Sequence, residues 1–355
     1  MASTHQDDAD TPVMGVPTDA NTARGRVVTF GEAMIRLTPP LNERLERTTS
    51  LEVTVGGAEL NTAVGLACLG TDASWVSALP ATALGRMVAR QATANGVDVS
   101  DVMWVDEDAG RAGLYFLEEG LDPRPSTVTY DRKGSALVNI RPGAFDWKYL
   151  LRDARLFHLS GITLALSPVV RAEAMEAVRV ANQLGVTVSF DLNYRSKLWS
   201  EAEARQAFVE IIPRVDVLFA SRGALRTFYG IEGSREDILR QAIEKLGVAA
   251  VTINRKQAKG SRRLKLTSYA MGQGGVLATS QTRDIEVLDR LGGGDAFAAG
   301  FLAAYLDNPH ALTWAVSLGA AACALKHTMR GDFLCATRGE IEAAAGGSGS
   351  GVLER

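Results

Sequence analysis

Cysteine and histidine are scarce in this chain of 355 residues, which contains three cysteines and four histidines. Three cysteines are too few for a disulfide framework, so we expect Cys68, Cys323 and Cys335 to be reduced, buried thiols. With so few thiols and imidazoles, the sequence shows no metal-ligand spacing. It therefore predicts neither a disulfide-rich domain nor a metal-binding residue.

Long apolar runs, a secretory signal and an excess of basic charge are also missing. No apolar stretch reaches the roughly 18–20 residues that a membrane span needs, and the N-terminal segment lacks the apolar core of a signal peptide. The net charge of -3 gives no basic surface for nucleic acid or for anionic lipid. We therefore expect a cytoplasmic protein without a nucleic-acid or membrane partner.

The composition suits one large α/β domain. Hydrophobic residues make up 46% of the chain and charged residues 22%, enough for a large core and a solvated surface. Residues 1–25 are polar, and we expect a disordered N-terminal tail. Residues 346–355 begin with a Gly/Ser stretch, which predicts a flexible C-terminal tail. The folded domain is expected to span residues 26–345.

Short apolar runs alternate with helical periodicity along most of the domain. Such alternation predicts a central, mostly parallel sheet with helices on both faces. The strand candidates are residues 27–30, 73–79, 157–159, 186–190, 215–219, 249–253 and 285–288, and the helix candidates are residues 61–69, 84–94, 169–184, 201–212, 235–246 and 295–306.

Two other stretches have a different pattern. Residues 51–55 and 111–130 alternate apolar and polar residues, which predicts a small sheet with one wet face outside the core. Residues 255–263 carry five basic side chains, and a solvated basic loop is the simpler interpretation of them. A contact with a nucleotide phosphate is the alternative.

Residues 289–297 read Asp-Arg-Leu-Gly-Gly-Gly-Asp-Ala-Phe and are the most informative segment. A strand candidate precedes them and a helix candidate follows. Glycines let peptide N–H groups approach a ligand, and a helix N-terminus adds partial positive charge. The N–H groups of Gly292, Gly293 and Gly294 are therefore predicted to form an anion hole for a phosphoryl group.

Asp295 begins the helix that follows these glycines. It could cap the helix, a common role of aspartate, or act as the general base that accepts a proton from a substrate hydroxyl. A GxxxxGK[ST] phosphate loop needs Lys and Ser or Thr, which this segment lacks, and a GxGxxG turn near the first strand is missing as well. The absence of GxGxxG argues against a dehydrogenase.

The same segment resembles the C-terminal signature D-T-x-G-A-G-D-[AS]-F of the ribokinase-like (PfkB) carbohydrate kinases. The chain departs from it at Arg290, where threonine is usual, and at Gly293, where alanine is usual. Residues 56–63, Gly-Gly-Ala-Glu-Leu-Asn-Thr-Ala, resemble the family's N-terminal G-G-A-x-x-N-x-A. The resemblance covers residues 27–342. It implies ATP-dependent phosphorylation of a sugar hydroxyl with Mg²⁺, and a small β-sheet lid at about residues 35–56 and 111–130.

Further segments resemble the 2-keto-3-deoxygluconate kinase branch of that family, in particular residues 130–136, 191–199 and 330–332. The resemblance implies a site for the sugar acid and contacts with ATP. The residues implied for the sugar acid are Gly57, Asn61, Tyr115, Tyr130, Arg132, Arg195 and Asp332, and those implied for ATP are Ser221, Gly292 and Gly294.

A sugar acid explains the arginines in these segments. Guanidinium matches a carboxylate better than any other side chain, and ribose or fructose would not require it. Arg132 and Arg195 are therefore predicted to bind the carboxylate. Plain packing of the lid is the alternative for Tyr115 and Tyr130.

One departure from the family bears on activity. An acidic N-x-x-E-like cluster that orders Mg²⁺ and phosphate is replaced by residues 220–224, Ala-Ser-Arg-Gly-Ala. Mg²⁺ would then depend on ATP oxygens and water. A ketodeoxygluconate kinase is the leading hypothesis. A fructokinase or ribokinase, and a non-catalytic sugar or nucleotide sensor on the same fold, are the alternatives. Pairing of two copies through the lid sheet is expected as the route to a homo-oligomer.

Overall fold

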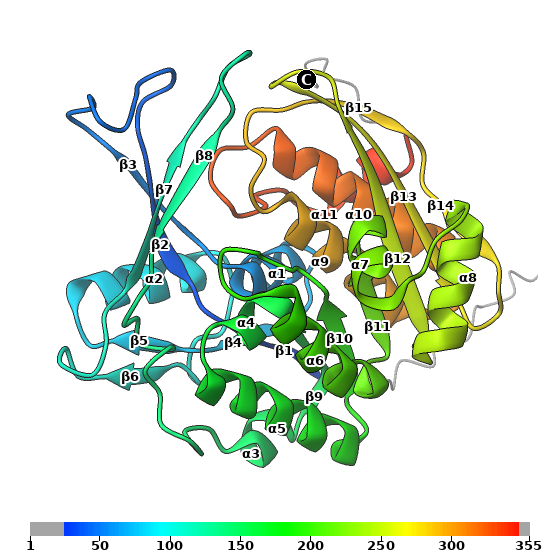
Figure 1. The fold of residues 1–355 in the computed structure, drawn as a ribbon, viewed down its shortest axis with the longest axis horizontal. Coiled ribbons are helices and arrows are strands. Elements are labelled where there is room, and N and C mark those ends of the chain that lie inside the picture. The colour runs from blue at the N-terminus through cyan, green and yellow to red at the C-terminus, as the bar shows by residue number, and fades with distance from the viewer. Residues whose placement is uncertain (1–24, 348–355) are drawn as a thin grey trace, which may run out of the picture.

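The computed structural model describes residues 25–347, which form a large sheet and a smaller one set at an angle to it (Figure 1). The predicted tails, residues 1–25 and 346–355, lie almost entirely outside the described residues, so they stay predictions. Between residues 25 and 347, no helix is both long enough and apolar enough to cross a membrane.

The large sheet has nine strands in the order β14-β13-β12-β11-β10-β9-β1-β4, with β15 also paired to β13. The strands from β12 to β4 are parallel, whereas β13, β14 and β15 form antiparallel pairs. The expectation of a mostly parallel sheet is confirmed. Its strands are β1 (Arg26–Phe30), β4 (Ala73–Val76), β9 (Ala154–Ser160), β10 (Thr187–Asp191), β11 (Val217–Ala220), β12 (Ala250–Ala258), β13 (Arg263–Gly272), β14 (Leu277–Thr279) and β15 (Arg283–Glu286).

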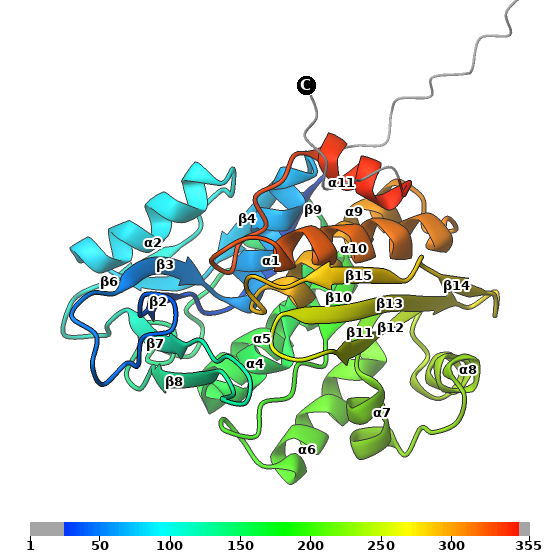
Figure 2. The same ribbon diagram turned by 90° about the horizontal axis from the view of Figure 1, so that it is seen from above.

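Helices cover both faces of this sheet (Figure 2). One face carries α1 (Ala58–Cys68), α9 (Gly293–Asp307), α10 (Leu312–His327) and α11 (Arg338–Ala345). The other carries α3 (Trp147–Leu151), α4 (Gly161–Ala165), α5 (Pro168–Leu184), α6 (Glu201–Ile211) with the short 3-10 turn η1 (Ile212–Arg214), α7 (Arg222–Tyr229) and α8 (Arg235–Leu246).

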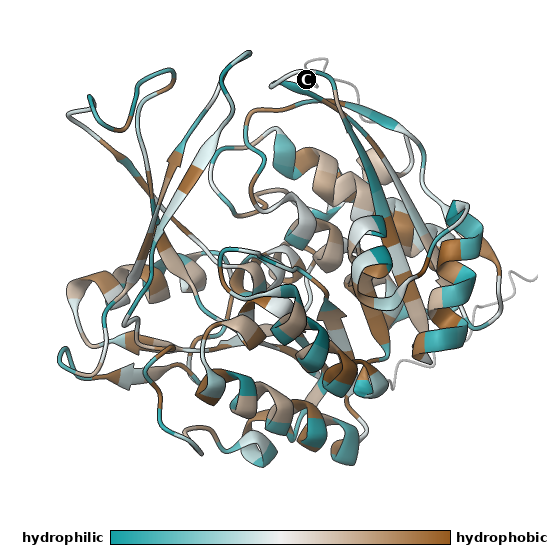
Figure 3. Ribbon diagram, in the orientation of Figure 1, coloured by the Kyte–Doolittle hydropathy of each residue, from teal (hydrophilic) through white to brown (hydrophobic). Residues whose placement is uncertain are grey.

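Each face has its own hydrophobic core, and successive residues of β1 belong to different cores. Val27 belongs to the core that contains residues of α1 and α9, while Val28 belongs to the core that contains residues of α5. A strand buried on both faces needs an uninterrupted apolar run, which is the pattern that identified β1. Figure 3 shows the contrast with the hydrophilic tips of the small sheet and of β12 and β13.

The small sheet stands beside the carboxyl ends of the central strands, in the order β3-β2-β7-β8 (Figure 1). Burial alternates along β7, where Tyr115 and Leu117 are buried and the residues between them are partly exposed. The separate small sheet expected from the alternating stretches is therefore present, and its role as a lid stays a prediction. Its strands are β2 (Met34–Thr38), β3 (Glu52–Gly56), β7 (Gly113–Glu118) and β8 (Thr127–Asp131).

Three local predictions are wrong. Of the cysteines expected to be buried, only Cys323 is; Cys68 is partly buried and Cys335 is exposed. The strand expected at residues 73–79 divides into β4 and β5 (Ala78–Pro80), and β5 leaves the large sheet to pair with β6 (Met103–Val105) beside α2 (Ala83–Ala94). Residues 255–258 are not loop but the end of β12, where Arg255 and Lys256 pair with Thr267 and Leu266 of β13. Backbone pairing with a long partner strand holds these charged residues extended, although their side chains stay in solvent.

Candidate active site

The glycine loop enters α9 through a conformation that only glycine adopts easily. Gly292 is the N-cap, with φ of 76°. A Cβ atom on it would lie 1.9 Å from the carbonyl oxygen of Asp332. A Cβ on Gly293 would lie 2.1 Å from Cε1 of the buried His327 ring, so the chain has glycine where the family usually has alanine. Gly294 has open space around it.

The N–H groups that the first turn of α9 leaves free are those of Gly293, Gly294 and Asp295, because the Ala296 N–H already donates to the Gly292 carbonyl. These amides face the start of the helix, where its dipole is positive. Gly292 shapes the turn that precedes them. The predicted anion hole at Gly292, Gly293 and Gly294 stays a prediction, and the Asp295 N–H is a further candidate donor.

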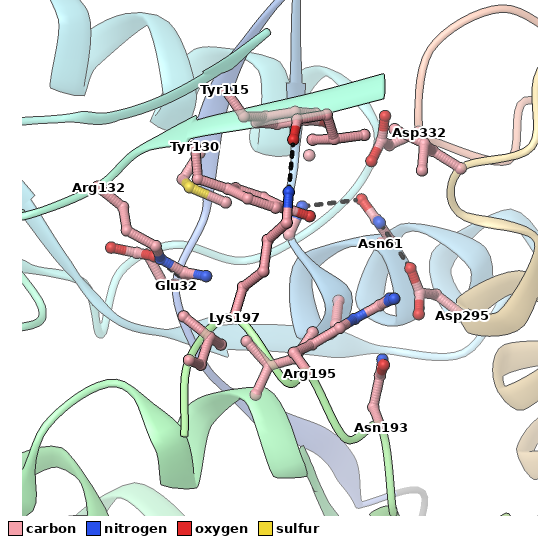
Figure 4. A pocket seen from close by; sticks show the side chains of 18 of the residues that line it. Glu32, Asn61, Tyr115, Tyr130, Arg132, Asn193, Arg195, Lys197, Asp295 and Asp332 are labelled. Carbon is pink, nitrogen blue, oxygen red and sulfur yellow. Dashed lines mark hydrogen bonds and ion pairs between the residues drawn. The ribbon is translucent and has the colours of Figure 1, made fainter. Parts of the chain in front are cut away.

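Asp295 is held by a side chain from a distant helix. Nδ2 of Asn61 on α1 donates to Oδ2 of Asp295 at 2.6 Å, and Oδ1 of Asn61 accepts from the Gly57 N–H at 3.2 Å (Figure 4). Burial raises the pKa of the Asp295 carboxyl to about 6, while the bond from Asn61 acts in the opposite direction. The cap of α9 is Gly292 without a side-chain bond, so the structure does not support the capping role for Asp295.

A cavity of about 430 Å³ lies between the small sheet, α1 and the start of α9. Its lining includes every residue predicted to bind the sugar acid, together with Gly292 and Asp295. Gly293, Gly294 and Ser221 are not in the lining. The lining residues that the sequence predicts are Gly57, Asn61, Tyr115, Tyr130, Arg132, Arg195, Asp332, Gly292 and Asp295.

The predicted arginines have different surroundings. Nη2 of Arg132 forms a short ion pair with Oε2 of Glu32, which also accepts from the Ser135 hydroxyl through Oε1. The Arg195 side chain makes no hydrogen bond or ion pair with any described residue, and its charge lowers the pKa of Asp295. Arg132 therefore brings a largely balanced charge to the cavity, while Arg195 brings an unbalanced one.

The two lid tyrosines lie together over the cavity. The rings of Tyr115 and Tyr130 are 6.0 Å apart between centroids. Tyr115 is 3% exposed, and its hydroxyl lies beside the carboxylate of Asp332 without a well-aligned hydrogen bond. Burial and the charge of Asp332 raise the pKa of Tyr115. Tyr130 is 42% exposed. A hydroxyl and a carboxylate that lie side by side in a cavity wall can both meet ligand oxygens, which favours a binding role over plain packing for Tyr115.

Several cavity residues escaped the sequence analysis, and three of them are charged or amide side chains. Glu32 follows the first strand and pairs with Arg132, and Asn193 extends from the segment after β10 (Figure 4). Lys197, on the same segment, donates to the Val128 carbonyl of β8 at 3.2 Å and so connects the small sheet to the main domain. Asn193 and Lys197 lie within the segment that resembles the kinase branch, and this proximity was the only available signal.

Glu59 lies below the cavity and is also absent from the sequence predictions. Its Oε1 accepts from the Ser160 N–H at 2.9 Å, from the Ser160 hydroxyl at 2.7 Å and from the Thr163 hydroxyl at 2.7 Å. Burial raises the pKa of this carboxyl. The bonds join α1 to the end of β9, so Glu59 fixes the helix that carries Asn61.

The nucleotide side of the site is less complete. Ser221 is exposed, and its hydroxyl caps α7 by accepting from the Ala224 N–H at 3.0 Å. Arg222 donates to the Gly233 carbonyl at 3.0 Å. Among residues 25–347, no group of three or more His, Cys, Asp or Glu side chains could hold a metal ion.

Comparison with known proteins agrees with this geometry. A 2-dehydro-3-deoxygalactonokinase of Haloferax volcanii is 38% identical over 328 residues, which cover 92% of this chain and 98% of that protein. A solved 2-dehydro-3-deoxygluconokinase from Thermotoga maritima has a TM-score of 0.87 at 37% identity, covering 91% of this chain and 98% of the other. A 5-dehydro-2-deoxygluconokinase of Bacillus velezensis is 28% identical over 280 residues, 78% of this chain and 81% of that protein.

The match to a family is as extensive as the match to single proteins. Residues 24–337 match the pfkB family carbohydrate kinases, and the ribokinase-like fold expected from the two glycine signatures is confirmed. The chain therefore belongs to the pfkB family of carbohydrate kinases, which are ATP-dependent sugar kinases.

Proposed function

We propose that this kinase transfers the γ-phosphoryl group of ATP to the terminal hydroxyl of 2-keto-3-deoxygluconate. The observation that carries the proposal is one cavity that contains both the Asp295–Asn61 pair and two cationic side chains, Arg195 and Lys197. Neither cation has a carboxylate partner within residues 25–347. An anionic sugar supplies the missing charge, and the names of two relatives with 37–38% identity refer to such keto-deoxy acids.

In the proposed reaction, Asp295 is the general base. Its carboxylate takes the proton of the terminal hydroxyl, and the hydroxyl oxygen bonds to the γ-phosphorus. The bond from that phosphorus to the bridging oxygen breaks, and ADP leaves. The free N–H groups of Gly293, Gly294 and Asp295 stabilise the charge on the transferring group, and Gly292 supplies the turn that aims them.

The sugar acid is proposed to lie under the small sheet. Arg195 and Lys197 bind its carboxylate, and Arg132 contributes through the N–H groups that Glu32 leaves free. The hydroxyl of Tyr115 and the carboxylate of Asp332 face the remaining sugar oxygens, since both line the same wall. Gly57 and Tyr130 complete the enclosure.

ATP is the phosphoryl donor, and Mg²⁺ is proposed to arrive with it. The described residues do not form an acidic metal site, so the ion would be held by phosphate oxygens and water. Ser221 is proposed as a nucleotide contact, because its hydroxyl only accepts in the cap of α7 and its own O–H can donate to a phosphate oxygen. A cytoplasmic location, where ATP is abundant, and a homo-oligomer formed through the small sheet complete the proposal. Val53 on that sheet is 44% exposed.

A panel of acceptors tests the proposal. ADP release would be measured with 2-keto-3-deoxygluconate, 2-keto-3-deoxygalactonate, gluconate, fructose and ribose. We expect turnover only with the keto-deoxy acids, and a higher kcat/KM for the gluconate epimer. In Arg195→Gln, the KM for the keto acid should rise by roughly 10- to 150-fold, since a hydrogen bond to a charged group contributes about 1.5–3 kcal/mol.

Other outcomes separate the alternatives. Equal or better turnover of fructose or ribose would keep the kinase and refute the carboxylate site. A preference for the galactonate epimer would correct the substrate within its class. Calorimetric binding of a keto acid without any ADP release would favour a sugar sensor. The exposed Ser221 and the missing acidic cluster would then be the features that explain the loss of kinase activity.

A further inference from the structure

A buried ion-pair cluster lies behind the cavity, and Asp332 is its only member with a role in the proposed mechanism. Arg36 on β2 is 3% exposed, and its Nη1 lies 2.7 Å from Oδ2 of Asp289 and 2.8 Å from Oδ1 of Asp332. Its Nε donates to the Thr38 hydroxyl at 2.9 Å. Removing a guanidinium from water is costly, so such an arrangement persists only when its partners are fixed. One nitrogen of the small sheet therefore holds two carboxylates of the main domain.

The first carboxylate controls the glycine loop. Oδ1 of Asp289 accepts from the Leu291 N–H at 3.0 Å, which closes the turn just before Gly292. Its Oδ2, the atom paired with Arg36, also accepts from the Gly331 N–H at 3.1 Å. The position of Asp289 therefore sets where the loop begins, and Arg36 sets the position of Asp289.

The second carboxylate belongs to the cavity wall. Asp332 is 7% exposed and lines the cavity, and its carbonyl oxygen packs directly against the backbone of Gly292. Burial raises the pKa of its carboxyl, whereas the Arg36 charge lowers it. Two carboxylates that share one cation repel each other once the cation is removed. Without Arg36, Asp332 would turn away from Asp289 and from its place beside the sugar.

A second cation lies in the same buried region. Lys326 on α10 is fully buried, and its Nζ donates to the Met329 carbonyl at 3.1 Å. Asp289 and Asp332 both act on its pKa, which burial lowers. Two acids and two bases thus share the region, and the removal of one acid together with one base leaves the charge balanced.

We propose that Arg36 is a positioning residue for phosphoryl transfer, which links the small sheet to the glycine loop through Asp289 and to the sugar site through Asp332. This inference rests on the proposed function for its kinetic consequence, but the link itself is structural. A contact made by the small sheet on one side of the cavity thereby aligns the amides that bind the phosphoryl group on the other.

Steady-state kinetics of Arg36→Met and Arg36→Lys test the link. We expect kcat to fall at least tenfold and the KM for 2-keto-3-deoxygluconate to rise at least tenfold in Arg36→Met, with the KM for ATP within twofold of wild type. Arg36→Lys keeps the charge but does not reach both acids. It should therefore show a smaller fall in kcat and a smaller rise in the KM for the keto acid, again with the KM for ATP unchanged. Values within twofold of wild type for a folded Arg36→Met protein would overturn the proposal.

A double variant separates positioning from general stability. Arg36→Met leaves two buried acids with one base, whereas Arg36→Met/Asp289→Asn removes one charge of each sign. We expect the double variant to recover most of the melting temperature lost in Arg36→Met but none of the lost kcat. Recovery of both together would mean that Arg36 serves stability alone, and the proposal would fail. Arg26→Met, which breaks the 2.8 Å pair with Asp101 at the edge of β1, is the matched control and should leave kcat unchanged.

Hydrogen exchange examines the link without any turnover. In Arg36→Lys, the amides of residues 289–295 and 330–332 should exchange at least tenfold faster than in wild type, and those of β10 and β11 should not change. Faster exchange there in a protein that phosphorylates no keto acid would refute the proposed function and keep the link. Unchanged exchange in these two segments would refute the link, whatever the substrate.

Discussion

Asp295 is tuned by opposing influences. Burial raises the pKa of its carboxyl to about 6, and the hydrogen bond from Asn61 favours the charged form. The nearby Asp191 carboxyl has its pKa raised to about 7, first by burial and then by the charge of Asp295. A general base must be ionised to act, so activity should be present above the pKa of Asp295 and decline as pH falls through it.

The first prediction concerns this acid limb. In the wild type, kcat/KM should decline below pH of about 6, the pKa of Asp295. Asn61→Leu removes the donor that favours the carboxylate, so the limb should move to higher pH by roughly 1–2 units if the bond contributes about 1.5–3 kcal/mol. A pH profile of kcat/KM for both proteins measures the shift. An unmoved limb would mean that Asn61 does not tune the base.

Gly292 shows how a single backbone angle can limit the site. Its φ of 76° and the 1.9 Å approach to the Asp332 carbonyl leave no space for a side chain. Gly143 has a similar φ of 74° but nothing within 4 Å of an added Cβ. Comparison of the two positions separates the effect of the left-handed backbone angle from the effect of a steric clash between an added Cβ atom and its neighbours.

The second prediction uses that pair. Gly143→Ala should lower the free energy of unfolding by about 1–2 kcal/mol, which is the cost of a left-handed backbone for alanine, and should leave kcat unchanged. Gly292→Ala adds a collision that must move the loop, so kcat should fall at least tenfold in addition to the loss of stability. Thermal melting and turnover measure both. Equal kcat in the two variants would show that the loop tolerates displacement.

Single site residues could be predicted from the sequence where they belong to a family motif. Asn61 and Asp295 belong to different signatures, and each signature marked its own residue, but their 2.6 Å bond joins positions far apart in sequence. The balancing of Arg132 by Glu32 and the cluster around Arg36 could not be predicted for the same reason. Which charged side chains pair depends on which strands lie next to each other in the fold, and this cannot be predicted from the amino-acid composition.

At the scale of elements, the β12–β13 hairpin contacts both sides of the cavity. Oδ2 of Asp122, in the loop between β7 and β8, accepts from the Ser261 N–H at 2.9 Å. Nη2 of Arg290 donates to the carbonyls of Gly260 at 3.1 Å and Ser261 at 3.0 Å. Figure 1 shows the tip of the small sheet beside the tip of this hairpin. Arg290, where the family usually has threonine, thus ties the hairpin to the glycine loop.

The third prediction tests this contact. Asp122→Ala removes an exposed hydrogen bond of about 0.5–1.5 kcal/mol, so the KM for the sugar acid should rise by roughly 2- to 12-fold if the contact favours the covered cavity. ATP hydrolysis without sugar should rise as well, because water would enter more often. Asp108→Ala, an exposed residue of the loop between β6 and β7, is the control. Identical kinetics for the two variants would show that the contact has no role in covering the cavity.

Elements with strong periodicity were predictable, and those held by pairing were not. The expected helix at residues 169–184 agrees with α5 within one residue, because an apolar face, a proline start and a glycine end mark it. The outer half of β12 carries charged residues without alternation, so only its ladder with β13 keeps it extended. Likewise, β5 leaves the sheet to pair with β6, a choice made by tertiary contacts.

At the scale of the molecule, the large sheet is the rigid frame, and the small sheet is proposed to enclose the cavity. The core on one side of β1 holds both α1 and α9 in fixed positions, and these helices carry Asn61 and Asp295. The strand and helix alternation predicted this arrangement because each unit needs a partner on the sheet. How the small sheet closes the cavity depends on contacts between distant segments, such as Lys197 with Val128.

The most direct test of the account measures ADP and phosphorylated sugar acid together, with 2-keto-3-deoxygluconate, ATP and Mg²⁺, for the wild type and Asp295→Asn. The account predicts equal amounts of ADP and 6-phosphate in the wild type, and a loss of roughly 10²- to 10⁴-fold in kcat for the variant, the usual contribution of a general base. The variant should still bind the sugar acid. Undiminished turnover in a folded Asp295→Asn protein, or ADP formed without phosphorylated acid in the wild type, would contradict the account.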